Sequence, residues 1–135
     1  MSYPIADVGT DADEATRLRA LKIRTSERFL EAAKNPKGRR QLAEETGIAE
    51  KRLLSLANCA DRMRIKGMGK EYAAILPAVG VDTVKELKYR NPEKLAKVIA
   101  ELNKKRKLVR FLPPVHLVTR WIENAKKLPL KITYR

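Results

Sequence analysis

Apolar residues recur at three- to four-residue spacing along most of this chain, a pattern that predicts amphipathic helices rather than strands. The regular positions are Leu53, Leu56, Ala60 and Met63, then Ala73, Leu76 and Val79, then Leu95, Val98, Ile99 and Leu102, and finally Val115, Val118, Ile122 and Ala125. Each group lies on one face of a predicted helix, and we expect these faces to be buried. Trp121 lies beside the last group and is predicted to be largely buried too. The pattern therefore predicts an all-α fold.

Capping residues and prolines mark where several of these helices begin and end. Asn35-Pro36 and Asn91-Pro92 each place a good N-cap before a proline, which suits the first helical position. Thr83 and Glu86 have the spacing of a capping box, in which a hydroxyl and a carboxylate satisfy two amides reciprocally. Pro77 removes a helical N–H, so the helix that contains it should kink or end just before it.

The stretch from Ile65 to Lys70 is a Gly-hydrophobic-Gly turn between two apolar-periodic segments. Gly67 and Gly69 can adopt backbone angles closed to other residues, and Met68 between them can point into the protein. The absent side chains leave amides open at the start of the next helix, where N–H groups and the helix dipole attract an anion. Such a turn either binds a phosphate or serves only to pack two helices.

Positive charge is concentrated in the second part of the chain. Of the 30 basic and 16 acidic residues, 9 and 9 lie in residues 1–50, whereas 21 and 7 lie in residues 51–135, which therefore carry the whole net charge of +14. This segregation favours a polyanionic partner. The basic residues around the turn are Arg62, Arg64, Lys66 and Lys70. A second basic run consists of Lys104, Lys105, Arg106 and Lys107. That run is either a second backbone contact or a solvated face.

The chain repeats itself at a fixed offset. Ala15, Leu18, Ala20, Ile23 and Thr25 correspond to Ala73, Leu76, Ala78, Val81 and Thr83. We therefore divide one domain, residues 1–135, into a first repeat, residues 1–62, a second repeat, residues 63–128, and an extended tail, residues 129–135. At the turn position the first repeat has only Val8-Gly9-Thr10, and the residues that follow include Asp11, Asp13 and Glu14. Carboxylates there would cap a helix and repel phosphate, so the first repeat is predicted to be structural.

Several classes of site receive no support from the sequence. Cys59 and His116 are the only residues of their types, so we expect no internal disulfide and no metal site, and we interpret Cys59 as a small core residue. The chain lacks a phosphate-loop motif, a nucleophile elbow and a catalytic carboxylate pair, so no enzymatic activity, cofactor or small-molecule substrate is expected. It also lacks an apolar run of about 18 residues and a secretory signal, which predicts a cytoplasmic protein without a membrane partner.

The turn and its flanks resemble the helix-hairpin-helix superfamily of DNA-binding modules. The matching residues are Ile65, Gly67-Met68-Gly69, Ala73, Leu76, Gly80-Val81 and Thr83-Val84. With both repeats included, residues 39–48, 63–70 and 80–87 resemble a bacterial family of small paired helix-hairpin-helix proteins described as a domain of unknown function. The resemblance implies two tandem helix-hairpin-helix repeats packed as one compact pseudo-symmetric domain. It further implies that the hairpin amides grip the nucleic-acid backbone, in the bacterial cytoplasm or nucleoid, without reading sequence.

These features predict sequence-independent binding to duplex DNA. The predicted contact residues are Arg64, Lys66, Gly67, Met68, Gly69, Lys70, Lys104, Lys105, Arg106 and Lys107. Structured RNA is not distinguished from DNA, because phosphate contacts carry no base information. The alternative is a structural subunit or adaptor that docks on protein or ribosomal RNA in a larger assembly.

A further alternative is a repressor-like helix-turn-helix. Residues 42–48 resemble its turn, and residues 50–58 would then be a recognition helix in the major groove. Glu44, Glu45 and Glu50 would face phosphates in that arrangement. Like-charge repulsion makes this the weaker interpretation.

Overall fold

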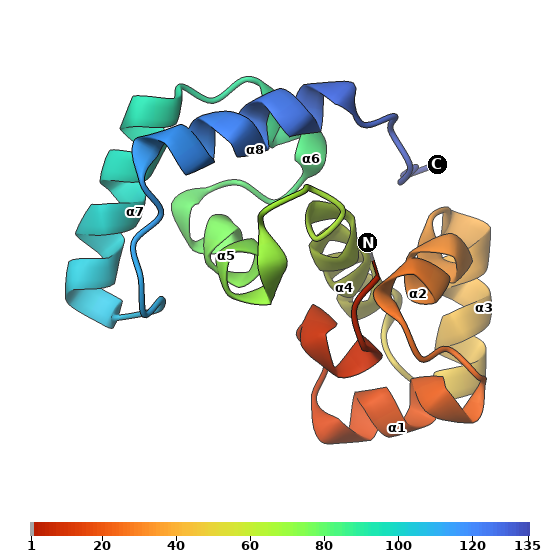
Figure 1. The fold of residues 1–135 in the computed structure, drawn as a ribbon. Coiled ribbons are helices and arrows are strands. Elements are labelled where there is room, and N and C mark those ends of the chain that lie inside the picture. The colour runs from red at the N-terminus through yellow and green to blue at the C-terminus, as the bar shows by residue number, and fades with distance from the viewer. Residues whose placement is uncertain (1) are drawn as a thin grey trace. The chain divides into compact units, whose positions relative to one another are not determined.

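The computed structural model describes residues 2–135, and within them all regular elements are helices apart from one isolated β-bridge between Pro4 and Thr25 (Figure 1). The predicted all-α class is confirmed. The chain divides into two compact units. The first unit contains the residues up to Arg64 together with Lys131–Arg135, and the second unit contains Ile65–Leu130.

The first unit is built on its last long helix. Its elements are the 3-10 helix η1 (Ile5–Val8) and the α-helices α1 (Ala12–Ala20), α2 (Ser26–Ala33), α3 (Pro36–Thr46) and α4 (Glu50–Arg62). Helix α4 packs against η1, α2 and α3. Its predicted apolar face is buried, including Leu53, Leu56 and Ala60, and Phe29 of the adjoining α2 is buried as well. Burying such side chains is the main stabilising contribution to a unit of this size. Cys59 is also buried, as predicted.

The C-terminal tail returns to this first unit. The amide of Thr133 donates to the carbonyl of Lys34 at 2.8 Å, and the buried guanidinium of Arg39 donates to the carbonyls of Thr133 and Ala33 at 2.7 and 2.8 Å. Lys131 also forms an ion pair with Glu31 at 2.9 Å. The residues that follow the second unit in sequence are therefore part of the first.

The second unit is organised around α8. Its elements are α5 (Gly69–Ile75), the 3-10 helix η2 (Leu76–Val79), α6 (Val84–Lys88), α7 (Pro92–Arg106) and α8 (Val115–Lys127). Helix α8 packs against α6 and α7 (Figure 1) and buries Val118, Trp121 and Ala125 completely. The predicted burial of Trp121 is confirmed. The α-helix ends at Ile75, just before the 3-10 turn that contains Pro77, as that proline predicts.

The predicted helix starts are confirmed in both units. The side chains of Asn35 and Asn91 accept hydrogen bonds from backbone amides three residues on, ahead of prolines at the first helical positions. Thr83 forms the predicted capping box with Glu86. These contacts satisfy amides that have no partner inside the helix, which explains why the helices begin at these residues.

Two apolar positions depart from the predicted pattern, because Val98 and Val115 are exposed. Val98 is adjacent to the buried Ile99, so it lies about 100° away around α7 and outside the stripe that α8 and η2 cover. Val115 is the first residue of α8, directly after Pro114. The buried faces are therefore narrower than the apolar spacing alone indicates.

Candidate nucleic-acid interface

The turn between Ile65 and Lys70 has the geometry that its two glycines suggest. Gly67 and Gly69 have φ values of 86° and 68°, in the left-handed region that glycine adopts without steric penalty. Met68 between them is buried, which confirms that it points inward. Glycine is therefore required here by the backbone path of the turn.

Two side chains of α8 donate hydrogen bonds to backbone carbonyls of this turn. The indole N–H of Trp121 donates to the carbonyl of Gly67 at 3.2 Å, and the side-chain amide of Asn124 donates to the carbonyl of Lys66 at 3.3 Å. In a trans peptide the N–H points opposite to the C=O. The N–H of Gly67 therefore points away from α8, on the exposed side of the turn.

The backbone amides that the turn could offer to a phosphate differ from the predicted set. The amide of Met68 donates to the carbonyl of Ile65 at 3.2 Å, so the expectation that Met68 contributes a free N–H needs correction. No acceptor within residues 2–135 is bonded to the amides of Gly67 and Gly69. A side chain at Gly69 would meet no heavy atom within 4 Å, so the space beside this amide is open.

The helix after the turn is also shorter than its apolar pattern suggests. Helix α5 has seven residues before the 3-10 turn that includes Pro77. We therefore describe the candidate site by the two turn amides and their flanking side chains, and not by the dipole of α5.

The basic residues predicted around the turn differ in their exposure and in their partners. Lys66 and Lys70 are exposed on either side of the Gly-Met-Gly sequence. Arg64 instead belongs to the first unit, where its Nε donates to Asp61 Oδ1 at 2.7 Å. Burial raises the pKa of Asp61, and the positive charge of Arg64 counteracts this rise. Arg64 thus compensates a buried carboxylate, and its contact with phosphate stays a prediction.

The second basic run lies away from the turn. Lys104, Lys105 and Arg106 form the last turn of α7, and Lys107 ends the helix with a φ of 49°. All four side chains are exposed, and within the described part of the chain no carboxylate pairs with them. In Figure 1 this end of α7 is the one far from α8, whereas the turn is bonded to α8. The two predicted groups are therefore separate surfaces of the second unit.

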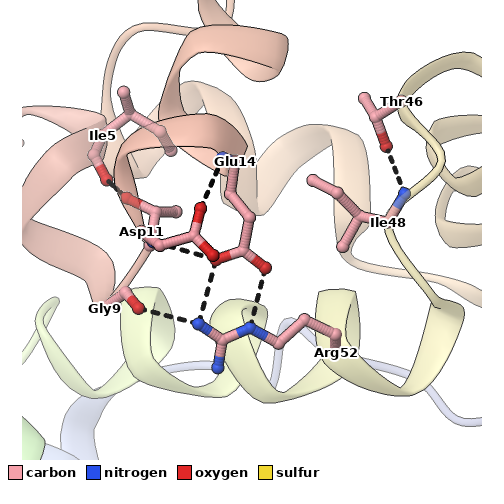
Figure 2. A network of polar contacts seen from close by, with 8 residues as sticks. Ile5, Gly9, Asp11, Glu14, Thr46, Ile48 and Arg52 are labelled. Carbon is pink, nitrogen blue, oxygen red and sulfur yellow. Dashed lines mark hydrogen bonds and ion pairs between the residues drawn. The ribbon is translucent and has the colours of Figure 1, made fainter.

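The corresponding turn of the first unit is closed by its own side chains (Figure 2). Gly9 has a φ of 95°, and its carbonyl accepts a hydrogen bond of 2.9 Å from Arg52 on α4. The carboxylate of Asp11 accepts from the amide of Glu14, and that of Glu14 accepts from the amide of Asp11. The side chain of Glu14 also pairs with Arg52 at 2.9 Å. The predicted capping of α1 by carboxylates is confirmed.

The charge state of Glu14 follows from its contacts. The hydrogen bond from Arg52 is the main reason that the pKa of Glu14 is lowered, although burial partly counteracts it. Glu14 is therefore ionised near neutral pH and places negative charge where a phosphate would have to approach. The amides of Asp11 and Glu14 after this glycine are occupied, in contrast to those of Gly67 and Gly69.

Two further sequence expectations concern metals and membranes. Across residues 2–135, no three His, Cys, Asp or Glu side chains are grouped so that they could hold a metal ion. No helix in the same range combines the length and the apolar character needed to cross a membrane.

The fold thus defines a helical protein of two units with one exposed glycine turn between basic side chains. Residues 8–128 match the model of the family described as Domain of unknown function (DUF4332). The chain belongs to this family, because the match covers well over half of its length. Comparison with curated proteins and with solved structures gives no match in either case.

Proposed function

We propose that this protein binds duplex nucleic acid, most readily DNA, through phosphate contacts that do not depend on sequence. The observation that carries the proposal is the turn of the second unit. Its carbonyls are bonded to Trp121 and Asn124, its Gly67 and Gly69 amides are open, and Lys66 and Lys70 flank them. Backbone amides beside basic side chains are a recurring arrangement for phosphate.

We further propose that the two units are tandem helix-hairpin-helix repeats. Matching hydrogen bonds follow α1 in the first unit and η2 in the second. The amide of Lys22 donates to Arg19 and that of Ile23 to Leu18, while the amide of Gly80 donates to Pro77 and that of Val81 to Leu76. Lys22 and Gly80, 58 positions apart, both have positive φ. Thr25 and Thr83, separated by the same offset, each cap the next helix. The shared offset in backbone bonds, positive φ and caps supports the proposal.

The proposal is tested by titrating unrelated duplexes at several salt concentrations. If about four to six phosphates are neutralised, log K should fall against log[salt] with a slope of roughly −4 to −5, nearly independent of sequence. Trp121, the only tryptophan, is bonded to the Gly67 carbonyl, so its emission should change when the turn is occupied. A flat salt response, or a thousandfold preference for one sequence, would contradict the proposal.

The alternative is a structural subunit or adaptor that docks on protein or ribosomal RNA. Purification from native cells with and without nuclease separates the two functions. A partner that remains after nuclease treatment, together with no duplex binding in the titration, would favour the adaptor.

A further inference from the structure

Large apolar side chains are exposed on the segment that joins α7 to α8. Phe111 is 70% exposed and Leu112 is 48% exposed, and Leu108 shortly before them is similarly accessible. Leaving such side chains in water forgoes the stabilisation that their burial would give, so exposed apolar groups gathered in a few residues indicate an interaction site.

This segment is held in place along its backbone. The side chain of Asn103 bonds both the amide and the carbonyl of Val109, at 2.9 and 3.2 Å. Val109 and Pro113 are buried on either side of the exposed residues. The hydroxyl of Tyr72 donates to the carbonyl of Phe111 at 3.0 Å. Phe111 and Leu112 are therefore displayed from a fixed backbone between two buried anchors.

The charge around the segment restricts the kind of partner. Arg110 lies between the anchors, and the exposed run from Lys104 to Lys107 precedes them. No Asp or Glu occurs between Glu101 and Glu123. Apolar side chains among positive charges without acidic neighbours fit an anionic partner that also has an apolar interior.

The position of the segment favours nucleic acid as that partner. Tyr72, which bonds the Phe111 backbone, lies on α5 only two residues after Lys70 of the candidate turn. The turn and the exposed segment therefore belong to one unit and are linked through one side chain. Two large apolar side chains and Arg110 project between the anchors, and Leu108 and Val115 are exposed on either side. Four apolar side chains interrupted by charge are still a small surface for a lipid interface or a stable dimer.

We propose that Phe111 and Leu112 are a wedge that enters a duplex bound at the turn, separates two stacked base pairs and kinks the helix axis. This inference rests on the function proposed above. Phe and Leu are among the side chains that architectural proteins insert between base steps, with bends on the order of 20–90°. Arg110 and the run from Lys104 to Lys107 would then contact phosphates on either side of the kink.

A wedge makes affinity depend on how easily the duplex unstacks. A nick or a mismatch already weakens stacking, so part of the deformation cost disappears. The wild-type protein should bind a nicked duplex at least about tenfold more tightly than the intact duplex of the same sequence. A protein that only contacts phosphates would bind both alike.

The test compares Phe111→Ser and Leu112→Ser with Tyr89→Ser in the full chain. Tyr89 is the matched control, because it is 80% exposed in the same unit but lies outside the wedge segment. Bending is measured by energy transfer between the ends of a labelled duplex, and unstacking by 2-aminopurine fluorescence. Wild type and Tyr89→Ser should bend the duplex and prefer the nick. The two wedge variants should still bind with the same salt slope, but they should lose both the bend and the nick preference. Circular dichroism checks that all three fold.

Other outcomes overturn the inference in distinguishable ways. Salt-dependent binding without bending would contradict the wedge but not the proposed function. Bending that survives both wedge substitutions would have the same meaning. If no duplex is bound at all, both the wedge and the proposed function are contradicted. Flotation with anionic phosphatidylserine vesicles that is lost in Phe111→Ser, without any duplex bending, would assign the segment to a lipid surface. A dimer in sedimentation that the same substitution dissociates, again without bending, would assign it to a second copy.

Discussion

The turns at Gly9 and at Gly67 have similar backbone geometry, but the residues around them differ. Both glycines have positive φ, and the carbonyl of each accepts a hydrogen bond from the last helix of its own unit, through Arg52 in the first unit and Trp121 in the second. In the first unit the neighbouring amides are occupied by carboxylates (Figure 2). In the second unit the amides of the two turn glycines have no acceptor within the described residues. The glycine thus defines the turn, and its neighbours decide whether a ligand can reach it.

The two side chains that donate to the glycine carbonyls also differ, because one is partly exposed and the other is buried. The side chain of Arg52 is 43% exposed and also pairs with Glu14, so its bond to Gly9 is a surface contact. Trp121 is completely buried and makes its bond to Gly67 from within the core of the second unit, where its ring also lies 5.1 Å from that of Tyr72. The second turn is therefore linked to the hydrophobic core, and the first to surface charges.

The largest expected effect follows from this difference. Trp121→Ala should lower the free energy of unfolding by about 3–5 kcal/mol, because it removes a fully buried aromatic side chain and leaves a cavity. Arg52→Ala removes the equivalent bond of the first turn, but it should cost only about 1 kcal/mol, since exposed polar contacts contribute little. Denaturant unfolding curves measure both values. Equal losses would mean that the two turns are held equally strongly.

The next effect concerns binding. Reversing the charges of Lys66 and Lys70 to Glu should weaken duplex binding roughly 30- to 100-fold at one fixed salt concentration, because about two phosphate contacts are lost. The matched control reverses Lys37 and Arg40, two exposed cations of the first unit for which the described residues provide no bonded partner. Arg17 is unsuitable as a control, since it bonds the carbonyl of Thr46 at 2.8 Å.

Both double variants change the net charge by the same amount. A protein that binds only through its overall positive charge would respond equally to the two, because long-range attraction depends on net charge. An adaptor without a nucleic-acid surface would respond to neither. Equal losses in the two variants would remove the turn from the proposed mechanism.

The local signals in the sequence predicted much of the fold. Asn35-Pro36, Asn91-Pro92 and Thr83 each act within a few residues of themselves, so their capping roles could be identified without knowledge of packing. The inward position of Met68 followed from the two glycines beside it. These caps and this turn, which depend on neighbours close in sequence, were therefore predicted correctly.

The contacts that shape the candidate site could not be predicted in this way. Trp121 and Asn124 bond residues more than fifty positions earlier, and nothing in their sequence context indicates this. Arg64 was predicted at the phosphate because of its charge, and its bond to the buried Asp61 was not predicted. Spacing assigned Val115 to a buried face, but the structure exposes it. The cases of Trp121, Asn124 and Val115 depend on which distant element covers a residue, whereas Arg64 pairs with a residue only three positions away.

Alanine substitutions at the two turns sharpen the comparison further. Gly9→Ala and Gly69→Ala should each cost about 1 kcal/mol of stability, because both positions have positive φ. No steric clash adds to this cost, since the new methyl group would lie no closer than 3.9 Å to a neighbouring heavy atom at either position. Only Gly69→Ala should also weaken duplex binding, by roughly three- to tenfold, since its methyl group occupies the open space beside the amide. Thermal unfolding and titration measure the two effects. A loss of affinity in Gly9→Ala would show that the first turn also contacts the ligand.

The smallest expected effect depends on pH. The pKa of Glu14 is lowered in the folded protein, chiefly by its hydrogen bond from Arg52, so its ionised form stabilises the first unit. This contribution is fully present above the unfolded pKa of about 4.3 and is lost as the pH falls through the lower folded value. Glu14→Gln should therefore reduce the free energy of unfolding by at most about 1 kcal/mol near neutral pH, because Arg52 is partly exposed, and should make no difference in strong acid.

Glu44→Gln is the control for this prediction, since Glu44 is exposed and has no bonded partner among the described residues. Its substitution should leave the pH dependence unchanged. Amide hydrogen exchange can then localise the effect of acid. Acid should increase opening at Asp11, whose amide donates to the carboxylate of Glu14. The turn at Gly67 is held by an indole and a side-chain amide that do not titrate in this range, so Trp121 should stay in place. Simultaneous opening of both turns in acid would contradict the view that only the first is held by charge.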